Sequence, residues 1–284
     1  MIPGPRGGRV LRLDGAMGTS LLARGLPPDV LPEAWVHHRP WEVAAVHAAH
    51  ACAGAEVLLS CTFNLARLDV AGADLDAGEV ASRALALARR ARPAAVAGCV
   101  GATGLAAIGG RGPAPAEFRD RYGLACGALA AAGADLIWIE TQHDLEEARA
   151  ALWAGRRTGL PVVTTAFLAP APGGMAALDG SPGVEFLEAL WRDGAAAGGV
   201  NCVAPDAALV RIVAQAASRI PVPLVVKPNA GLPGRPIGPA PFAAGVAAAV
   251  RAGATLAGGC CGAGPAHLRA LAIAAGAVPP QARG

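Results

Sequence analysis

The sequence has almost no lysine and few aromatic residues. Lys227 is the one lysine among 24 basic residues, and Phe, Trp and Tyr make up 4% of the 284 residues. We attribute the missing lysines to composition rather than to function. The net charge of +3 is spread along the chain without a basic block, so the charge pattern gives no support for nucleic-acid binding.

Long apolar runs are also missing. One long stretch without a charged residue, residues 93–110, is interrupted by five glycines and a threonine, which argues against a membrane span. The first nine residues contain no apolar run typical of a secretory leader. The seven cysteines are an odd number and lack the spacing of a small disulfide scaffold. We therefore expect reduced thiols and a cytoplasmic protein.

Eight short β-branched runs alternate with longer Ala, Leu and Arg runs of helical period. This alternation predicts an α/β protein with a single (β/α)8 TIM barrel, forming one domain over residues 1–284. No Gly-x-Gly-x-x-Gly follows the first strand, which disfavours a dinucleotide-binding open sheet. The strands are predicted at residues 9–14, 56–62, 94–98, 135–140, 161–167, 197–202, 223–228 and 254–258, and the helices at residues 41–53, 78–91, 116–132, 145–158, 184–193, 207–218, 241–252 and 265–275.

Glycines stand where several helices are expected to end. The sequence repeats Ala-Gly-Ala or Ala-Gly-Gly just before a predicted strand. A glycine past the end of a helix suits the left-handed backbone of a C-cap. We therefore expect such caps at Gly54, Gly133, Gly198 and Gly253. The tail, residues 278–284, is expected to fray.

Polar residues gather where the predicted strands end. In a (β/α)8 barrel the active site lies at the carboxyl ends of the strands, here called the barrel mouth. Each of these residues could have an ordinary structural role, but their shared placement at the strand ends favours one functional site. The residues that we expect at the barrel mouth are Asp14, Thr62, Glu140, Cys202, Asn229, Cys260 and Cys261.

Three of these residues are cysteines. Adjacent Cys260 and Cys261 rarely reach the geometry of a disulfide, but flanking glycines let both turn toward one metal ion. With Cys202 they provide three thiolates, and three protein ligands with one open position is the pattern of catalytic zinc. The alternative is that these cysteines are small buried hydrophobic residues, the role that we expect for Cys52, Cys99 and Cys126. The role of Cys61 is left open.

An open zinc position beside three thiolates favours a thiol substrate. A free thiol has a pKa near about 8.5, and coordination to zinc deprotonates it. The resulting sulfur is a nucleophile suited to displacing a methyl group from a leaving group. A zinc hydrolase would favour histidine or carboxylate ligands, and the histidines at 37, 38, 47 and 50 lie in the first loop and helix, where we expect surface or packing roles.

Two carboxylates, Asp14 and Glu140, are also expected at the barrel mouth. Paired acids are suited to hold the ammonium group of an amino-acid thiol. Gly15 and the backbone amides that follow it are suited to the carboxylate of the same substrate. The alternative is that Asp14 caps the following turn and that Glu140 forms an ion pair within the barrel.

Together these motifs resemble the homocysteine S-methyltransferase family over almost the whole chain. The two most specific motifs are Gly199-Val-Asn-Cys202 and Gly258-Gly-Cys-Cys-Gly262. Others are Leu13-Asp-Gly-Ala-Met-Gly-Thr19, Thr62-Phe63 and Gly133-Ala-Asp-Leu-Ile-Trp-Ile-Glu-Thr141 with Asp144. The stretches at residues 98–104 and 227–233 look most similar to the homocysteine-binding module of cobalamin-dependent methionine synthase.

The resemblance implies a zinc-dependent transfer of a methyl group to homocysteine, giving methionine, with no catalytic residue beyond the zinc site. Zinc is expected on Cys202, Cys260 and Cys261. Homocysteine is expected to bind zinc through sulfur and to use Asp14 and Glu140 for its polar end. Asn229 is a candidate oxygen ligand that fills the open position before substrate binds, or else a turn residue before Gly231.

The methyl donor stays open between a methyl-corrinoid on a separate protein and a small cation such as S-methylmethionine or betaine. Few aromatic residues are available for a cage around a cationic donor, which favours the corrinoid. Two other functions remain possible at this point. One is a non-catalytic or partner-dependent barrel subunit that binds thiol or zinc in a corrinoid methyltransferase system, and the other is methyl transfer to a different thiol. Neither a nucleic acid nor a membrane is an expected partner.

Overall fold

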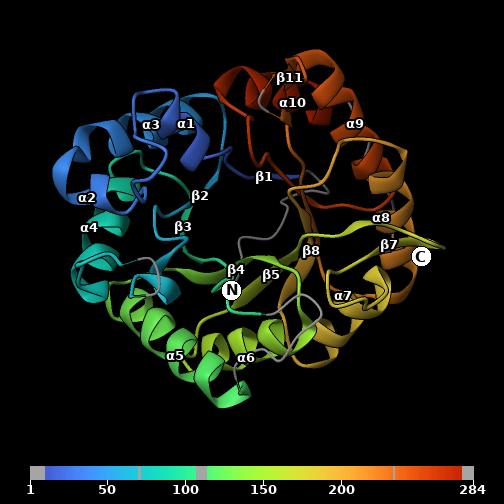
Figure 1. The fold of residues 1–284 in the computed structure, drawn as a ribbon. Helices are drawn as coiled ribbons and strands as arrows, with labels where there is room; N and C mark the ends of the chain where they lie inside the picture. The colour runs from blue at the N-terminus through green and yellow to red at the C-terminus, as the bar shows by residue number, and fades with distance from the viewer. Residues whose placement is uncertain (1–9, 70–71, 107–113, 233, 277–284) are drawn as a thin grey trace.

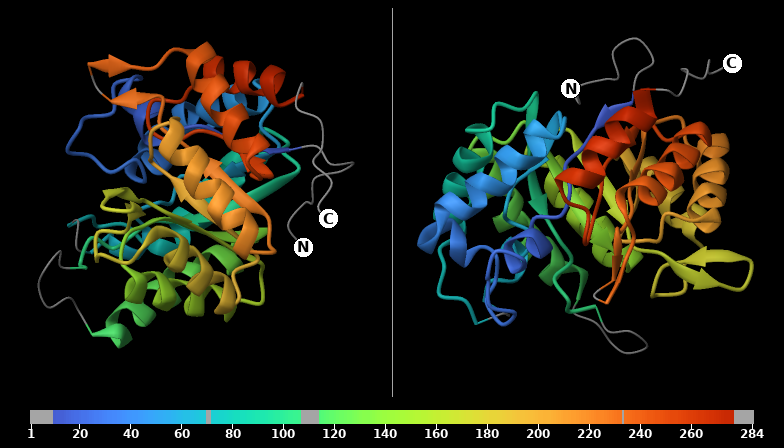
Figure 2. Two further views of the ribbon diagram at one scale, coloured as in Figure 1. Left: turned by 90° about the vertical axis from the view of Figure 1, so that its right-hand side faces the viewer. Right: turned by 90° about the horizontal axis from the view of Figure 1, so that it is seen from above.

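The computed structural model describes residues 10–69, 72–106, 114–232 and 234–276. Eight parallel strands curl into a barrel with helices packed around it (Figures 1 and 2). Leu11 and Arg12 pair with the last strand, and a parallel bridge from Leu13 to Val57 joins the first strand to the second, so that the ring closes. The predicted (β/α)8 barrel is confirmed. Its strands are β1 (Leu11–Arg12), β2 (Val57–Leu59), β3 (Ala95–Val100), β4 (Leu136–Gln142), β5 (Val162–Ala166), β8 (Ala197–Asn201), β9 (Leu224–Lys227) and β12 (Leu256–Ala257).

A long helix follows each strand, within a few residues of its predicted bounds. Three of these helices begin with an aspartate cap that was not predicted from the sequence. The side chains of Asp76, Asp144 and Asp206 each accept a hydrogen bond from a backbone N–H of the first turn. The helices are α3 (Pro40–Cys52), α4 (Ala77–Arg89), α5 (Pro115–Ala131), α6 (Leu145–Arg156), α7 (Gly183–Arg192), α8 (Ala207–Arg219), α9 (Pro239–Arg251) and α10 (Pro265–Gly276).

Several short elements were not predicted, because they lie in the loops and are too short to show a hydrophobic period. Two hairpins extend the barrel mouth loops, and the first of them, β6 with β7, projects from the barrel in Figure 2. The short elements are α1 (Gly18–Leu22), α2 (Ala34–His38), the 3-10 turn η2 (Leu65–Arg67), β6 (Ala169–Ala171), β7 (Gly174–Ala176), β10 (Gly231–Leu232) and β11 (Arg235–Pro236).

The strands are buried on both faces. Along β3, Ala95, Ala97 and Cys99 belong to the cluster inside the barrel, whereas Val96 and Val100 pack against the helices. This alternation follows from the two-residue period of a strand. Because both faces are apolar, a polar side chain inside the barrel needs a specific partner, and such side chains appear at the mouth.

Three of the four predicted glycine caps are confirmed. Gly54, Gly133 and Gly253 have φ angles of 102°, 85° and 126° in the left-handed region. The prediction for Gly198 is wrong, because Gly198 lies within β8 and the cap of α7 is formed instead around Gly194, with φ of 101°. The predicted frayed tail lies outside the described residues. Within the described residues, no helix combines the length and the apolar character that crossing a membrane requires.

Candidate metal and thiol site

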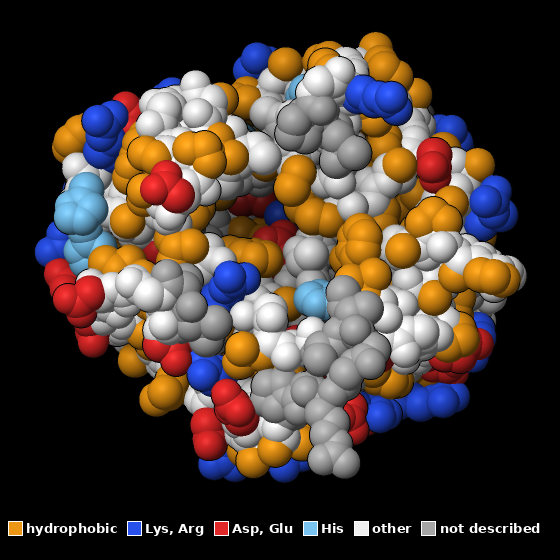
Figure 3. Space-filling view, in the orientation of Figure 1, with side chains coloured by type: hydrophobic (Ala, Val, Ile, Leu, Met, Phe, Trp, Pro, Cys, Tyr) orange, Lys and Arg blue, Asp and Glu red, His pale blue; other side chains and the backbone are white. Residues whose placement is uncertain are grey.

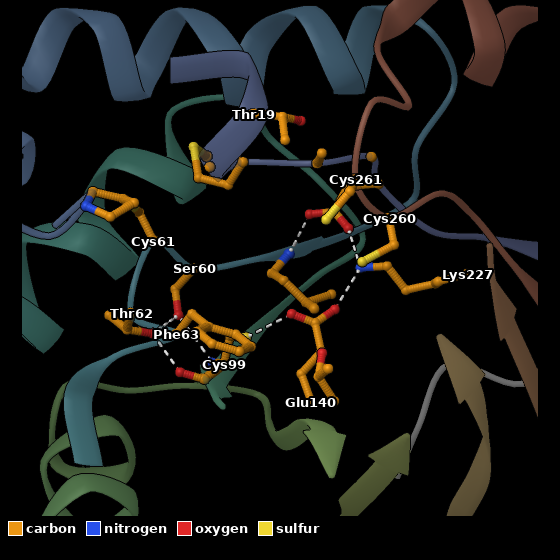
Figure 4. A pocket seen from close by; sticks show the side chains of 18 of the residues that line it. Thr19, Ser60, Cys61, Thr62, Phe63, Cys99, Glu140, Lys227, Cys260 and Cys261 are labelled. Carbon is orange, nitrogen blue, oxygen red and sulfur yellow. Dashed lines mark hydrogen bonds and ion pairs between the residues drawn. The ribbon is translucent and has the colours of Figure 1, made fainter. Parts of the chain in front are cut away.

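A pocket of about 330 Å³ opens at the barrel mouth. Figure 3 shows a hollow at the centre of this face, with acidic and basic side chains visible inside it. In the close-up of Figure 4, Cys260, Cys261 and Lys227 lie on one side of the pocket, and the labelled residues of the loop after β2, with Cys99 of β3, lie opposite. Its walls therefore come from strands that are far apart in the sequence.

The three predicted metal ligands come together in this pocket. Cys202 directly follows β8, and Cys260 and Cys261 follow β12. Their sulfur atoms all lie within 4.8 Å of one another, and in the described part of the chain they are the one such group of candidate metal ligands. The Cys202 sulfur is 2.8 Å from that of Cys260 and 3.9 Å from that of Cys261.

This cluster suits zinc in its chemistry. All three thiols are free. Zinc–sulfur bonds of about 2.3 Å in a tetrahedron place two sulfurs about 3.8 Å apart, which matches Cys202 and Cys261 and requires Cys202 and Cys260 to separate. Hydrogen bonds from Cys202 and Cys260 lower the pKa of the Cys261 thiol to about 3, since they stabilise its thiolate. The cluster thus offers a thiolate at neutral pH.

The backbone holds the cysteines in place. Cys202 has a φ of 57°, in the left-handed region that non-glycine residues rarely adopt. Its N–H donates to the Lys227 carbonyl at 3.1 Å, while the Cys260 N–H donates to the Pro228 carbonyl at 2.8 Å. Both chain segments are therefore fixed to the end of β9, which lies between β8 and β12 in the sheet.

The two predicted acids also line the pocket, but an ammonium group of the protein already lies between them. Lys227 Nζ lies 2.9 Å from Asp14 Oδ1 and 3.2 Å from Glu140 Oε1. The second oxygen of Asp14 accepts the Leu59 N–H at 2.7 Å. The ion pair within the barrel that was the alternative for Glu140 is thus present, and Asp14 takes part in it rather than capping a turn.

Burial and charge compete in this group, called here the acid–lysine group (Asp14, Lys227 and Glu140). The Lys227 and Asp14 side chains are 2% and 3% exposed, and that of Glu140 is 12% exposed. Burial lowers the pKa of Lys227, but the charges of Asp14 and Glu140 outweigh it and leave the pKa raised. Burial raises the pKa of Glu140, and Lys227 only partly opposes this. Lys227 therefore stays charged.

Asn229 and Gly15 lie next to the cluster. Asn229 Nδ2 donates to the Cys202 carbonyl at 2.9 Å, and its buried Oδ1 has no hydrogen-bond partner among the described residues. That oxygen is a candidate ligand, and the predicted role of Asn229 stays a prediction. Gly15 lines the pocket, and a side chain there would collide with the Ala263 carbonyl. Its predicted contact with substrate is likewise untested.

Asn201 and Thr141 were not predicted as part of the site. β4 extends two residues beyond its predicted end, with a register shift after Ile139, and Thr141 has a φ of 60°. Asn201 Nδ2 donates to Thr141 Oγ1 at 2.6 Å and reaches the sulfurs of Cys202 and Cys260, each at 3.7 Å. No spacing in the sequence shows this contact, because it depends on the irregular end of β4.

The opposite wall is built from the loop after β2. Thr62 Oγ1 donates to the Cys99 carbonyl at 2.7 Å, so it holds the wall in place. Phe63 packs over Gly101, where any side chain would collide with its ring. Buried Glu33 accepts hydrogen bonds from the backbone and side-chain N–H groups of Asn64. These contacts hold the loop after β2 in place beside the pocket.

The other cysteines divide by burial. Cys61, Cys99 and Cys126 are buried, which agrees with the packing role expected for Cys99 and Cys126, and burial raises the pKa of each thiol. Cys61 and Cys99 also line the pocket. The packing role expected for Cys52 is wrong, because this cysteine is exposed at the end of α3.

The fold and the site define a (β/α)8-barrel protein with a three-thiol candidate metal site and an acid–lysine group at its mouth. Comparison with known proteins identifies its family. The chain belongs to the homocysteine S-methyltransferase family, whose model matches residues 11–275.

Similar proteins agree with this assignment. Methionine synthase of Mycobacterium tuberculosis is 30% identical over 94% of this chain, and that of Mycobacterium leprae is 28% identical over 94%. The chain spans about a quarter of the length of both, 24% in each case. The metallated crystal structure of the homocysteine methyltransferase MmuM from Escherichia coli superposes with a TM-score of 0.79 at 26% identity, covering 93% of this chain and 96% of MmuM.

Proposed function

We propose that this protein transfers a methyl group to the thiol of homocysteine, giving methionine. The observation that carries the proposal is that three cysteine sulfurs share one pocket with the acid–lysine group. The sulfurs suit the thiol end of the substrate, and the charged group suits its amino-acid end. Membership of the homocysteine S-methyltransferase family supports the same reaction.

Cys202, Cys260 and Cys261 are the residues that we propose to hold a zinc ion. Three sulfur ligands from two loops, with no histidine in the cluster, are a donor set that zinc prefers. When bound, zinc would deprotonate the homocysteine thiol and keep its sulfur nucleophilic. The E. coli relative is known in a metallated form, which supports a metal in this protein.

The acid–lysine group would bind the amino-acid end of homocysteine. Two carboxylates and one ammonium leave a net charge of −1, which attracts the ammonium of the substrate. The substrate carboxylate would meet the backbone near Gly15. The N–H of Ala16 already donates to the Ala263 carbonyl at 3.0 Å, so the first N–H groups of α1 are the better donors.

Methyl transfer then requires the homocysteine sulfur to approach the methyl carbon of the donor directly. A new carbon–sulfur bond forms on homocysteine while the bond from the methyl carbon to the donor breaks, and the leaving group takes the electron pair. The protein contributes by orienting the sulfur and by keeping water out with apolar residues of the walls, such as Met17, Leu22 and Phe63.

A methyl-corrinoid is the donor that the pocket favours. A sulfonium or ammonium donor is usually held by several aromatic rings. Among the described residues that line the pocket, Phe63 is the one aromatic residue. The resemblance of residues 98–104 and 227–233 to the homocysteine-binding module of cobalamin-dependent methionine synthase agrees with this donor.

The second candidate is a partner-dependent barrel that binds zinc and homocysteine but does not complete the reaction alone. The observation in its favour is that Phe63 is the one aromatic residue among the described residues that line the pocket, so that a free cationic donor lacks an aromatic cage. Both candidates predict about one zinc ion per chain in the intact site. They differ in whether the isolated protein produces methionine from a free donor.

A donor panel tests the proposal. The purified zinc-loaded protein is incubated with homocysteine and, separately, methylcobalamin, S-methylmethionine or betaine, and methionine is measured. We expect methionine with methylcobalamin, its loss in Cys260→Ser, and wild-type activity in Cys52→Ser, which removes an exposed thiol outside the pocket. Zinc and homocysteine binding without methionine from any donor would favour the partner-dependent barrel. Zinc retention by Cys260→Ser would contradict the proposed metal site.

A further inference from the structure

Asn201 is a buried amide that joins the cysteine cluster to β4. Its side chain is 0% exposed, and it lies at the end of β8 immediately before Cys202. Its Oδ1 accepts the Thr141 N–H at 3.2 Å, and its Nδ2 donates to Thr141 Oγ1 at 2.6 Å. A buried amide with both ends engaged has a fixed orientation.

The contacts of Thr141 decide which end of the amide faces the sulfurs. A backbone N–H can only donate, so the amide group next to the Thr141 N–H must be the oxygen. The nitrogen then points toward the cluster, where it lies 3.7 Å from both the Cys202 and the Cys260 sulfur. One of its two hydrogens serves Thr141 Oγ1, and the other is shared between the two sulfurs.

The protein maintains this contact with an unusual backbone. Thr141 is a β-branched residue with a φ of 60°, at the register shift of β4. Cys202 also has a positive φ, of 57°. The strand order β4, β5, β8 means that the Asn201–Thr141 contact spans the end of β5. Two left-handed residues thus place one amide against two sulfurs.

An N–H donor withdraws electron density from a thiolate and makes it a weaker nucleophile. A site that methylates a substrate sulfur beside three cysteine sulfurs must avoid methylating its own ligands. We propose that Asn201 is a positioning residue that protects Cys202 and Cys260 from methylation, so that the substrate sulfur is the one that reacts. This inference rests on the proposed function, and it extends that function to the choice among sulfurs.

Methyl iodide provides a direct probe of this choice. It methylates a thiolate by forming a carbon–sulfur bond while iodide leaves with the electron pair. Zinc-loaded wild type, Asn201→Ala and Asn201→Asp are treated without homocysteine, and methylation of each cysteine is measured by peptide mass spectrometry together with the zinc content. Asn201→Asp keeps the size and the oxygen that faces the Thr141 N–H, but it removes the N–H donor. Thr141→Ser, which keeps the hydroxyl acceptor, is the matched control.

We expect both Asn201 variants to retain zinc and to be methylated several-fold faster at Cys202 and Cys260. The rate at Cys261, which the amide does not contact, should stay at the wild-type value, and Thr141→Ser should show the wild-type pattern. An unchanged pattern with zinc retained would overturn the inference. Loss of zinc from both variants would overturn it too, because Asn201 would then hold the site together rather than protect its sulfurs.

Failure of the inference and failure of the proposed function give different results. If only the protective role is wrong, wild-type protein still contains zinc and forms methionine, and the methylation pattern is unaffected by the Asn201 substitutions. If the proposed function is wrong, wild-type protein lacks zinc at the three cysteines or forms no methionine with any donor.

Discussion

Lys227 connects two acids that are far apart in the sequence. It lies 213 residues from Asp14 and bonds to it at 2.9 Å in the interior of the barrel. No local pattern in the sequence indicated the partners of Lys227. A lysine at the end of a buried strand that also carries Val225 and Val226 is the signal that could have revealed it, because a charge there needs a partner.

Replacing Lys227 should therefore be costly. Lys227→Met leaves Asp14 and Glu140 buried without a counter-charge, and breaking a buried pair in this way costs about 3 to 5 kcal/mol. Urea unfolding of the purified variant measures this loss. In a double-mutant cycle, Lys227→Met combined with Asp14→Asn should cost less than the sum of the single substitutions. Strict additivity would show that the two side chains are not coupled.

The cysteine residues were the part of the site that the sequence indicated best. Adjacent cysteines flanked by glycine are rare, and their position after a strand, like that of Cys202, is visible in the pattern. The predicted placement of all three sulfurs in one cluster agrees with the structure. The Asn201 contact was not predictable, since it depends on a φ of 60° at Thr141 and on a strand irregularity.

At the scale of the element, the eight strand–helix units were predictable because short β-branched runs alternate regularly with longer Ala, Leu and Arg runs. Strands that are buried on both faces appear in the sequence as short apolar runs, and the helices between them appear as longer runs of helix-forming residues. The short helices α1 and α2 and the two hairpins were not, because two to five residues carry no period. The end of β4 was placed two residues early for a related reason, since a bulge leaves no mark in composition.

Strand β8 has a specific need for glycine beside the site. A side chain at Gly199 would collide with the Val225 carbonyl on β9, whereas one at Gly198 would lie 3.4 Å from Thr164 Oγ1, an ordinary contact. Gly199→Ala should therefore destabilise the protein by about 1 to 3 kcal/mol, as overpacking does. Because Cys202 directly follows this strand, zinc content should fall as well.

Gly198→Ala is the matched control for this prediction. It adds the same methyl group one residue away, and the free energy of unfolding should stay within about 0.5 kcal/mol of wild type. Urea unfolding and zinc analysis of the two variants make the comparison. Equal stability of the two variants would contradict the close approach of β8 to β9 at Gly199.

At the scale of the whole molecule, buried histidines make stability depend on pH. His47 and His50 on α3 are buried, and their ring nitrogens have no hydrogen-bond partners among the described residues. The packing role predicted for them is consistent with this, whereas His38 is exposed. Burial lowers the pKa of His47 from 6.5 to about 4 and also lowers that of His50, although Asp14 partly opposes both shifts.

The direction of the effect follows from these shifts. Below pH 6.5 His47 binds a proton in the unfolded chain but stays neutral in the folded protein. The free energy of unfolding therefore falls as the pH falls toward about 4. The fall from His47 alone is about 3 kcal/mol over this range. His47→Gln should flatten the fall between pH 6.5 and 4, and His38→Gln should not. Urea unfolding at several pH values measures it, and parallel curves for wild type and His47→Gln would refute the shift.

Homocysteine binding in a weakly buffered solution near pH 7 tests most directly whether the substrate sulfur joins Cys202, Cys260 and Cys261 at a metal. A free thiol with a pKa near about 8.5 is mostly protonated at this pH, and binding to zinc removes the proton. A pH indicator should record release of about one proton per homocysteine bound to zinc-loaded wild type, and none with Cys260→Ser. Tight homocysteine binding without proton release would contradict binding through the sulfur.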